Sequence, residues 1–364
     1  MKALVFLRHY NDIDHITPVI FKWVDSGHRC DVVLLGKKKF IRDYRIEFLR
    51  KLNGVHVVHV HELLSSLEFI RWRLQMLMLV RSAHDSILSP LVKYFNRAYD
   101  FKKREPVWQR VTNCLLSYCF KEGEQGVVVF DWIERNSYIC VEWVETFVSM
   151  ARNIGLGTVS LPHGDSPHAS QLIRRGEWVL EPDTSFSAAG MFDQVVVPNE
   201  LCSVRFRSLF DNRKIAVLGS PRYCDEWLAK LATILPPSPL AQSDSKLKVV
   251  MFLRKANYTT FWEEVGEVVQ VIAAFPGVEL AIKPHTRGGW KQSLTNDTEL
   301  QRLPNVTMIN DDVHSIHLLN WADVIIDLAT SVVYEAIKAK KPVLAADYLH
   351  SGRSAAAVFM PETE

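Results

Sequence analysis

This sequence carries almost no net charge and none of the common short catalytic motifs. Its 364 residues include 43 Lys and Arg against 41 Asp and Glu, a formal charge of +2, which excludes a nucleic-acid binder of the simple basic kind. It contains no Gly-x-x-x-x-Gly-Lys-Ser/Thr segment, no Gly-x-Gly-x-x-Gly after its first strand and no Gly-x-Ser-x-Gly. P-loop chemistry, dinucleotide-dependent redox chemistry and a hydrolase nucleophile elbow are therefore not indicated.

Paired metal-binding cysteines and long apolar runs are also absent. The six cysteines are scattered, without a Cys-x-x-Cys pair, so we interpret them as buried, reduced thiols of a cytosolic protein. No apolar stretch reaches the ~18 residues that would indicate a membrane-spanning helix, and no secretory leader pattern precedes the first strand-like segment. We expect a cytoplasmic protein, with any membrane contact peripheral and at the inner face of the cell membrane.

Strand and helix signals alternate along most of the chain. Helical periodicity separates short apolar runs at 3–7, 31–35, 55–60, 126–130, 157–161, 193–197 and 214–218. Continuous apolar runs are typical of parallel strands that are buried on both faces, and this spacing indicates βαβ units.

A proline-rich and serine-rich segment divides the chain. Residues 235–245, LPPSPLAQSDS, show no periodicity and predict a linker. A second series of strands follows at 247–253, 278–282, 305–309, 324–327 and 342–346. We therefore expect an α/β protein with two Rossmann-like doubly wound domains that face a central cleft. The predicted domains are 1–234, with a helical insertion at about 61–120, and 246–364.

The helical stretch at 61–120 interrupts the strand–helix rhythm of the first domain. It brings Arg71, Trp72, Arg73, Met76 and Arg81 close together in the sequence. Two interpretations remain open: an insertion that packs on the sheet, or a basic, aromatic-bearing surface that touches a membrane or a lipid-linked acceptor.

Polar clusters follow several of the strands, at the sheet edge where open α/β proteins bind their ligands. The segment 162–168, PHGDSPH, comes directly after a strand of the first domain. His163 suits acid–base work near neutral pH. Asp165 could orient this histidine, accept a proton or act as a nucleophile, and Gly164 allows a ligand to approach the backbone closely. A capped turn with a surface histidine is the alternative.

Two further clusters carry groups that suit phosphate. Ser220 and Arg222 follow another first-domain strand and offer a hydroxyl and a guanidinium, although a plain turn would look the same. Lys283, His285 and Arg287 alternate at the end of a second-domain strand and suit a diphosphate. A solvated basic turn is the alternative there.

A fourth cluster lies where the strand 324–327 leads into a helix. Thr330 and Ser331 stand at the predicted helix start, where free backbone N–H groups favour phosphate. Glu335 lies one turn further and could accept ribose hydroxyls. A capping box around Ser331 with a salt-bridged Glu335 is the alternative.

These segments resemble the GT-B glycosyltransferases. In detail they resemble the branch of bacterial surface-polysaccharide synthesis that includes CDP-glycerol glycerophosphotransferases and capsular Kdo transferases. The His-Gly at 163–164 is similar to the family's His-Gly after an N-domain strand, and Lys-Pro-His at 283–285 to its Lys/Arg-Pro-His segment. Residues 327–335 with KKPVL at 340–344 are similar to the family's nucleotide-gripping segment. The motifs cover about thirty residues.

The resemblance implies a metal-independent glycosyltransferase of lipopolysaccharide or capsule synthesis. It would move a sugar, such as Kdo from CMP-Kdo, from a nucleotide donor to a growing cell-surface polysaccharide or a lipid-linked glycan. No cofactor is implied beyond the donor substrate, which could be a cytidine nucleotide. The implied catalytic residues are His163 and Asp165, with Asp165 as nucleophile in a retaining enzyme or as the acceptor's base in an inverting one. The implied donor-binding residues are Gly164, Ser220, Arg222, Lys283, His285, Arg287, Thr330, Ser331 and Glu335.

Three other functions fit the same residues. A CDP-glycerol-type enzyme would transfer a polyol phosphate instead of a sugar. A non-hydrolysing nucleotide-sugar 2-epimerase shares the fold and would use His and acidic residues to abstract a proton beside the sugar. A non-catalytic protein would bind the sugar nucleotide without turning it over.

Overall fold

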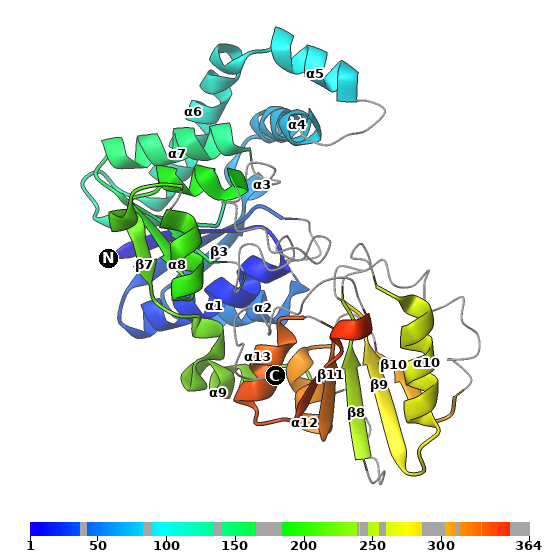
Figure 1. Ribbon diagram of the computed structural model, residues 1–364. Coiled ribbons are helices and arrows are strands. Elements are labelled where there is room, and N and C mark those ends of the chain that lie inside the picture. The colour runs from blue at the N-terminus through cyan, green and yellow to red at the C-terminus, as the bar shows by residue number, and fades with distance from the viewer. Residues whose placement is uncertain are drawn as a thin grey trace. The chain divides into compact units, whose positions relative to one another are not determined.

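The computed structural model describes most of the chain in two compact units. The described residues are 1–36, 42–82, 89–133, 140–162, 164, 184–207, 209–238, 240, 247–254, 260–285, 303–309, 313–328 and 330–349. The first unit holds the described residues as far as Ile234, and the second holds those from Leu235 onward (Figure 1).

A seven-stranded parallel sheet forms the centre of the first unit. Its strands are β1 (Lys2–Leu7), β2 (Arg29–Leu34), β3 (Val55–His59), β4 (Gly126–Asp131), β5 (Gly157–Leu161), β6 (Gln194–Val197) and β7 (Ile215–Val217). They lie in the order β3-β2-β1-β4-β5-β6-β7. The order reverses between β1 and β4, so the carboxyl ends of these two strands form a topological switch point, the usual ligand position in such sheets.

Helices cover this sheet, and their apolar sides meet it in an aromatic core. They are α1 (Tyr10–Asp25), α2 (Tyr44–Lys51), α7 (Val141–Asn153), α8 (Glu200–Arg207) and α9 (Asp225–Ile234), with short 3-10 turns η2 (Thr184–Met191), η3 (Asn212–Lys214) and η4 (Pro221–Tyr223). Phe6 of β1 stacks on Phe130 of β4 at 4.3 Å between ring centroids, and Phe147 of α7 meets Phe6 edge-on at 5.1 Å. Trp143 of α7 is fully buried beside these rings.

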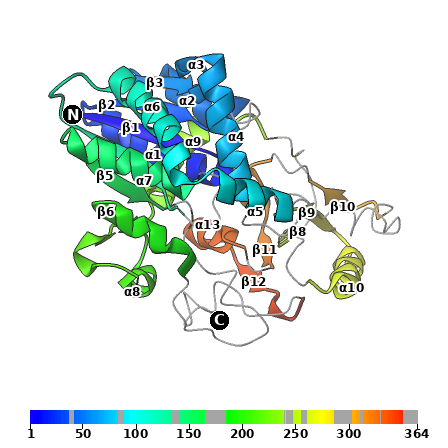
Figure 2. The same ribbon diagram turned by 90° about the horizontal axis from the view of Figure 1, so that it is seen from above.

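The residues between 60 and 119 form helices that pack on the first unit. These are α3 (Val60–Leu63), α4 (Ser66–Ser82), α5 (Ser89–Ala98) and α6 (Phe101–Cys119), and α4 lies beside α6 (Figure 2). Trp72 of α4 is fully buried and meets Trp143 edge-on at 5.3 Å. Arg104 of α6 pairs with Glu142 at 2.7 Å. The structure therefore shows the predicted packing of this stretch against the sheet-bearing unit. Among the described helices, none is long and apolar enough to cross a membrane.

A polar clamp joins β5 to the start of β6. Asp193 accepts hydrogen bonds from the backbone N–H of Thr158 (2.9 Å) and from its hydroxyl (2.7 Å), and it pairs with Arg152 at 2.7 Å. Partial burial alone would raise the pKa of this carboxyl group. The hydrogen bonds from Thr158 and the charge of Arg152 outweigh burial, so the pKa of Asp193 lies below its ordinary value.

The second unit is built around a five-stranded parallel sheet. Its strands are β8 (Leu247–Phe252), β9 (Val278–Lys283), β10 (Val306–Met308), β11 (Val324–Asp327) and β12 (Val343–Ala345), in the order β10-β9-β8-β11-β12. Its described helical segments are α10 (Trp262–Ala273), α12 (Ser315–Trp321), α13 (Val332–Lys338) and η6 (Asp347–Leu349). Val250 and Met251, neighbours on β8, enter two different apolar clusters, so both faces of this sheet are buried, as the continuous apolar runs predict. The strand order reverses between β8 and β11.

Candidate functional site

A buried charge cluster lies at the switch point of the first sheet. Arg8 follows β1 and pairs with Asp131, the last residue of β4. Asp12 in the first turn of α1 accepts the backbone N–H of Arg8 at 2.8 Å, and its carboxylate lies 3.7 Å from the Arg8 Nε. The side chains of Asp12 and Asp131 are fully buried, and that of Arg8 is 5% exposed. Among the described contacts, one guanidinium is therefore shared by two carboxylates at the edge where a ligand would enter.

His9 brings a titratable group to the same edge. It is the N-cap of α1, and its Nδ1 lies 2.8 Å from the Oδ1 of Asp12. The His9 side chain is 32% exposed, whereas that of Asp12 is fully buried. A histidine held by a buried carboxylate and partly exposed to solvent is a candidate for proton transfer.

A second group of charges surrounds the predicted phosphate residue Arg222 in η4. Its Nη1 lies 3.0 Å from Asp14 Oδ2 and 3.3 Å from His15 Nε2, both on α1. Asp14 also pairs with Arg45 of α2 at 2.5 Å. Arg222 thus has a carboxylate partner within the protein. Ser220 lies beside it, and its Oγ is buried without a hydrogen-bond partner among the described residues.

The carboxyl edge of the second sheet also gathers buried charges. Lys283 ends β9 and Asp327 ends β11, and each is in register with Phe252 of β8 from either side. Two strand spacings separate them, about 10 Å. Arg254 lies two residues beyond Phe252. The exposed fractions of Arg254, Lys283 and Asp327 are 5%, 5% and 2%. Two buried cations and one carboxylate at the same edge, at a switch point, suit an anionic ligand.

The predicted helix start at α13 is organised by Asp327. Its carboxylate accepts the hydroxyl of Thr330 and the backbone N–H of Thr330, the latter at 2.9 Å. Ser331 is the N-cap of α13, exposed, and its side chain makes no capping hydrogen bond. Glu335 is the fourth residue of the helix and accepts a hydrogen bond from Ser315 of α12. Ser331 therefore does not form the capping box of the alternative interpretation, because its side chain makes no capping hydrogen bond.

Several predicted site residues lie outside the described residues: His163, Asp165 and Arg287. Gly164 and His285 are described and half-buried, at the ends of the segments that follow β5 and β9. The structure thus places Lys283, Thr330 and Glu335 near the carboxyl edge of the second unit's sheet. Ser220 and Arg222 lie together in the first unit. Their predicted roles in binding a donor stay predictions.

Sequence reasoning missed the two arginines that follow the central strands. The tripeptide Phe-Leu-Arg occurs at 6–8 and again at 252–254. In each unit this tripeptide lies at the end of a strand beside the switch point, β1 or β8. The strand on the other side of the switch point, β4 or β11, ends in an aspartate, Asp131 or Asp327. This repeat could have identified both arginines from the sequence, because an arginine that directly follows an apolar strand lies at the ligand-binding edge of a parallel sheet.

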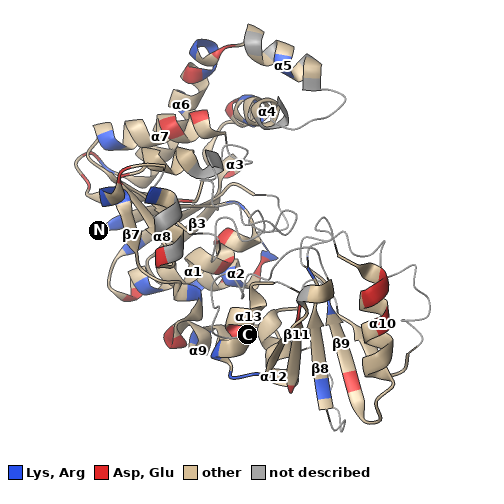
Figure 3. Ribbon diagram, in the orientation of Figure 1, with Lys and Arg blue, Asp and Glu red and all other residues tan. Residues whose placement is uncertain are grey.

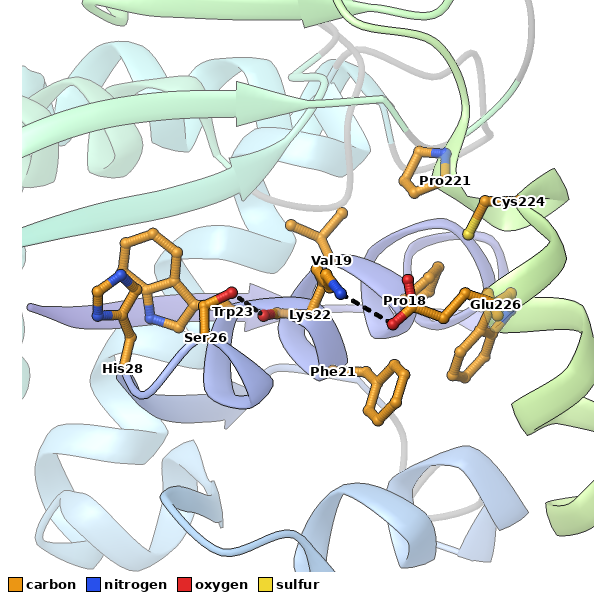
Figure 4. Close-up of a pocket in the computed structure, with 11 residues that line it drawn as sticks. Pro18, Val19, Phe21, Lys22, Trp23, Ser26, His28, Pro221, Cys224 and Glu226 are labelled. Carbon is orange, nitrogen blue, oxygen red and sulfur yellow. Dashed lines mark hydrogen bonds and ion pairs between the residues drawn. The ribbon is translucent and has the colours of Figure 1, made fainter.

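A cavity of about 500 Å³ lies elsewhere in the first unit, along the second half of α1 (Figure 4). Apolar side chains dominate its wall, including Phe21 and Trp227, and the pair Lys22–Glu226 at 2.8 Å spans it. None of the described site residues predicted from the sequence is among its lining residues. We therefore place the candidate functional site at the sheet edges and not in this cavity.

Comparisons with known proteins identify the fold. No protein-family model matches the chain, and no curated protein matches it in sequence. The UDP-GlcNAc 2-epimerase from Neisseria meningitidis, solved bound to UDP-GlcNAc, is similar over 95% of this chain and 82% of its own, with TM-score 0.55 and 12% identity. The UDP-N-acetylglucosamine 2-epimerase from Rickettsia bellii is similar over 96% and 80%, with TM-score 0.54 and 11% identity. The glycosyltransferase of kitacinnamycin is similar over 95% and 81%, with TM-score 0.50 and 13% identity.

These likenesses confirm the predicted fold class: two Rossmann-like α/β units of the GT-B type. At 11–13% identity they show the fold and not the reaction. The narrower resemblance to CDP-glycerol and Kdo transferases stays a prediction.

Proposed function

We propose that this chain is a GT-B enzyme that acts on a nucleotide-sugar donor, and that it is a glycosyltransferase. One observation carries the proposal: both sheets gather buried charged side chains at the carboxyl edge of their switch points. In an open α/β sheet that edge is where the ligand binds. A protein of the same fold has been solved bound to UDP-GlcNAc.

The second unit is proposed to hold the donor. Lys283 and Arg254 would offset the negative charge of the phosphates, with His285 and Arg287 extending the cationic edge. Thr330, Ser331 and Glu335 would contact phosphate and ribose, as the resemblance implies. In the transfer step the bond between the anomeric carbon and the donor phosphate oxygen breaks, and the electron pair stays on the phosphate. Cationic side chains favour this step, because they stabilise the charge that develops on the leaving nucleotide.

The first unit is proposed to hold the acceptor and the group that moves its proton. An acceptor hydroxyl forms the new bond to the anomeric carbon and gives its proton to a base. His163 and Asp165 remain the predicted catalytic pair, with Gly164, Ser220 and Arg222 beside the donor. The His9–Asp12 pair is a second base at a strand end of the same unit.

The finer details follow the resemblance. The donor is proposed to be a cytidine nucleotide, such as CMP-Kdo, and the acceptor a growing surface polysaccharide or a lipid-linked glycan. The enzyme is proposed to work in the cytoplasm, with a peripheral contact at the membrane. Transfer of a polyol phosphate from a CDP donor is the nearest variant of this proposal.

A second function has an observation of its own. Two of the similar structures are UDP-GlcNAc 2-epimerases, with TM-scores of 0.54 and 0.55. An epimerase would remove the proton at C2 of the sugar and return it to the opposite face, so the nucleotide would stay attached in the product. The same edges could serve that chemistry, with His9 or His163 as a proton carrier.

One experiment separates these functions. Thermal melting is measured with CMP, CDP, UDP, GDP, ADP and dTDP, because a ligand that binds only the native state raises the melting temperature. The sugar nucleotide of the stabilising base is then incubated with the protein in D2O. Release of nucleotide, with water in the acceptor's place taking the sugar, supports a transferase, whereas deuterium at C2 without release supports the epimerase. Stabilisation without either change would support a non-catalytic binder, and the lack of any stabilisation would refute the donor site.

Site variants test the donor residues. Lys283→Met and Glu335→Gln are expected to weaken nucleotide binding at least tenfold. Their matched controls are Lys338→Met on α13 and Glu263→Gln on α10, which change the same residue types outside the edge. Equal affinity of the site variants and their controls would refute the donor assignment. His163→Ala and Asp165→Ala are expected to abolish turnover and to leave donor binding within severalfold.

A further inference from the structure

Helix α4 carries an apolar face on each side. Trp72 and Met76 point into the first unit and are 0% and 3% exposed. On the opposite side a row of four aliphatic residues is open to solvent at the spacing of one helical stripe. These residues, with their exposed fractions, are Leu67 (58%), Ile70 (53%), Leu74 (54%) and Leu77 (38%). We call this row the α4 stripe.

Aromatic side chains extend the apolar surface from the stripe toward α5 and α6. The hydroxyl of Tyr99 accepts a hydrogen bond from Gln75 of α4 at 3.3 Å, which places this tyrosine along the flank of the stripe. Tyr99 is 41% exposed, and Phe101 at the start of α6 is 42% exposed. Exposed apolar side chains gathered on neighbouring helices are typical of an interaction site.

Positive charge is concentrated on the same helices. Residues 66–103 contain seven Lys and Arg against three Asp and Glu, a net charge of +4. The whole chain has a net charge of +2, so the rest of the chain has −2. Four basic residues on these helices are exposed: Arg71 on α4, Lys93 on α5, and Lys102 and Lys103 at the start of α6. Figure 3 shows Lys and Arg positions on α5 and α6 in blue. The count excludes Arg104, which is buried against Glu142.

We propose that the α4 stripe and its basic surround bind the surface of an anionic lipid bilayer. A helix that exposes leucines between basic side chains lies in the interface plane, because its apolar groups enter the acyl boundary and its cations meet the anionic headgroups. A second copy of this chain is a poorer occupant. A specific dimer buries about 800 Å² on each partner, and four half-exposed side chains on one helix fall well short of that area. This inference deepens the peripheral membrane contact of the proposed function, and vesicle binding tests it separately from the reaction.

Vesicle flotation with the full chain tests the proposal. Wild-type protein is mixed with vesicles of pure phosphatidylcholine or with vesicles that contain about a third phosphatidylglycerol. We expect binding to the anionic vesicles that is at least fivefold stronger, and that weakens as salt screens the charges. The double variant I70Q/L74Q is expected to lose most of this binding. The charge variant K102E/K103E is expected to weaken it severalfold and leaves the apolar stripe unchanged.

Ile154→Gln is the matched control, because Ile154 is 55% exposed on the same unit and far from the stripe in sequence. It should bind vesicles as the wild type does, and all variants should keep the wild-type melting temperature because the replaced side chains are exposed. Equal binding of I70Q/L74Q and wild type, or no preference of the wild type for anionic vesicles, would overturn the proposal. So would light scattering that shows a wild-type dimer and an I70Q/L74Q monomer, since the stripe would then be a protein interface.

Discussion

Replacing Arg8 should destabilise the first unit more than replacing either of the carboxylates that it holds. Arg8 lies between Asp12 and Asp131, and all three side chains are 5% exposed or less. In Arg8→Met the two buried carboxylates lose their shared guanidinium. Removing one partner of a buried ion pair costs about 3–5 kcal/mol, because the remaining charge stays in a site of low polarity.

Asp131→Asn is the informative comparison. The asparagine keeps the shape of the side chain, and Arg8 keeps Asp12, whose carboxylate lies 3.7 Å from its Nε. The three side chains then sum to zero charge instead of −1. The cost should be that of a hydrogen bond to a charged group, about 1.5–3 kcal/mol. We therefore expect Arg8→Met to cost about 2 kcal/mol more than Asp131→Asn.

Urea unfolding followed by circular dichroism measures both costs at neutral pH. Arg29→Met is the control, because Arg29 is 69% exposed and its pair with Glu124 at 2.9 Å is a surface pair, worth less than about 1 kcal/mol. An Asp131→Asn variant as unstable as Arg8→Met would refute the charge balance at this edge. A cost of Arg8→Met no greater than that of Arg29→Met would show that the cluster is not buried as described.

Three further predictions concern the packing and the pH dependence of the first unit. Trp143→Ala should lower the free energy of unfolding by about 3–5 kcal/mol in urea titrations, since it empties the centre of the aromatic core; a loss below 1 kcal/mol would contradict that position. Gly126→Ala should lower the melting temperature by several degrees, because its Cβ would lie 2.8 Å from the Lys2 carbonyl oxygen. Gly157→Ala is the control and should melt close to the wild type, because the nearest atoms to a Cβ there are 4.0 Å away. Because the pKa of Asp193 is lowered in the folded state, its carboxylate stabilises the fold at pH values above the unfolded-state pKa of about 4. This stability is lost as the pH falls through the folded-state pKa. Asp193→Asn should therefore have a lower urea midpoint than wild type at neutral pH and the same midpoint at low pH, and a difference between the two midpoints that does not change with pH would refute the linkage.

The strands and their direction could be predicted from local sequence. The run at 157–161 is a strand with those bounds, and the strand at 324–327 likewise. In β1 and β8, burial on both faces is visible within the strand itself as a run of five and four consecutive apolar residues. The alternation with helices then implies parallel pairing, and the carboxyl edges follow as the place to look for ligands. Lys283, Thr330 and Glu335 were predicted in this way to lie near such an edge, and their roles in binding stay predictions.

The partners of the charged groups could not be predicted from local sequence. Arg8 and Asp131 are 123 residues apart, and they meet only because β1 and β4 are neighbours across the switch point. Glu335 meets Ser315 because α12 packs beside α13. The packing of the insertion also depends on the tertiary structure, which turns Trp72 inward and the α4 stripe outward. The membrane interpretation of the same helices stays a proposal. Hydrophobic periodicity acts over a few residues and fixes which segments become strands and helices. Strand order and helix packing depend on burying the whole chain at once, so only the tertiary structure decides which charges share a site.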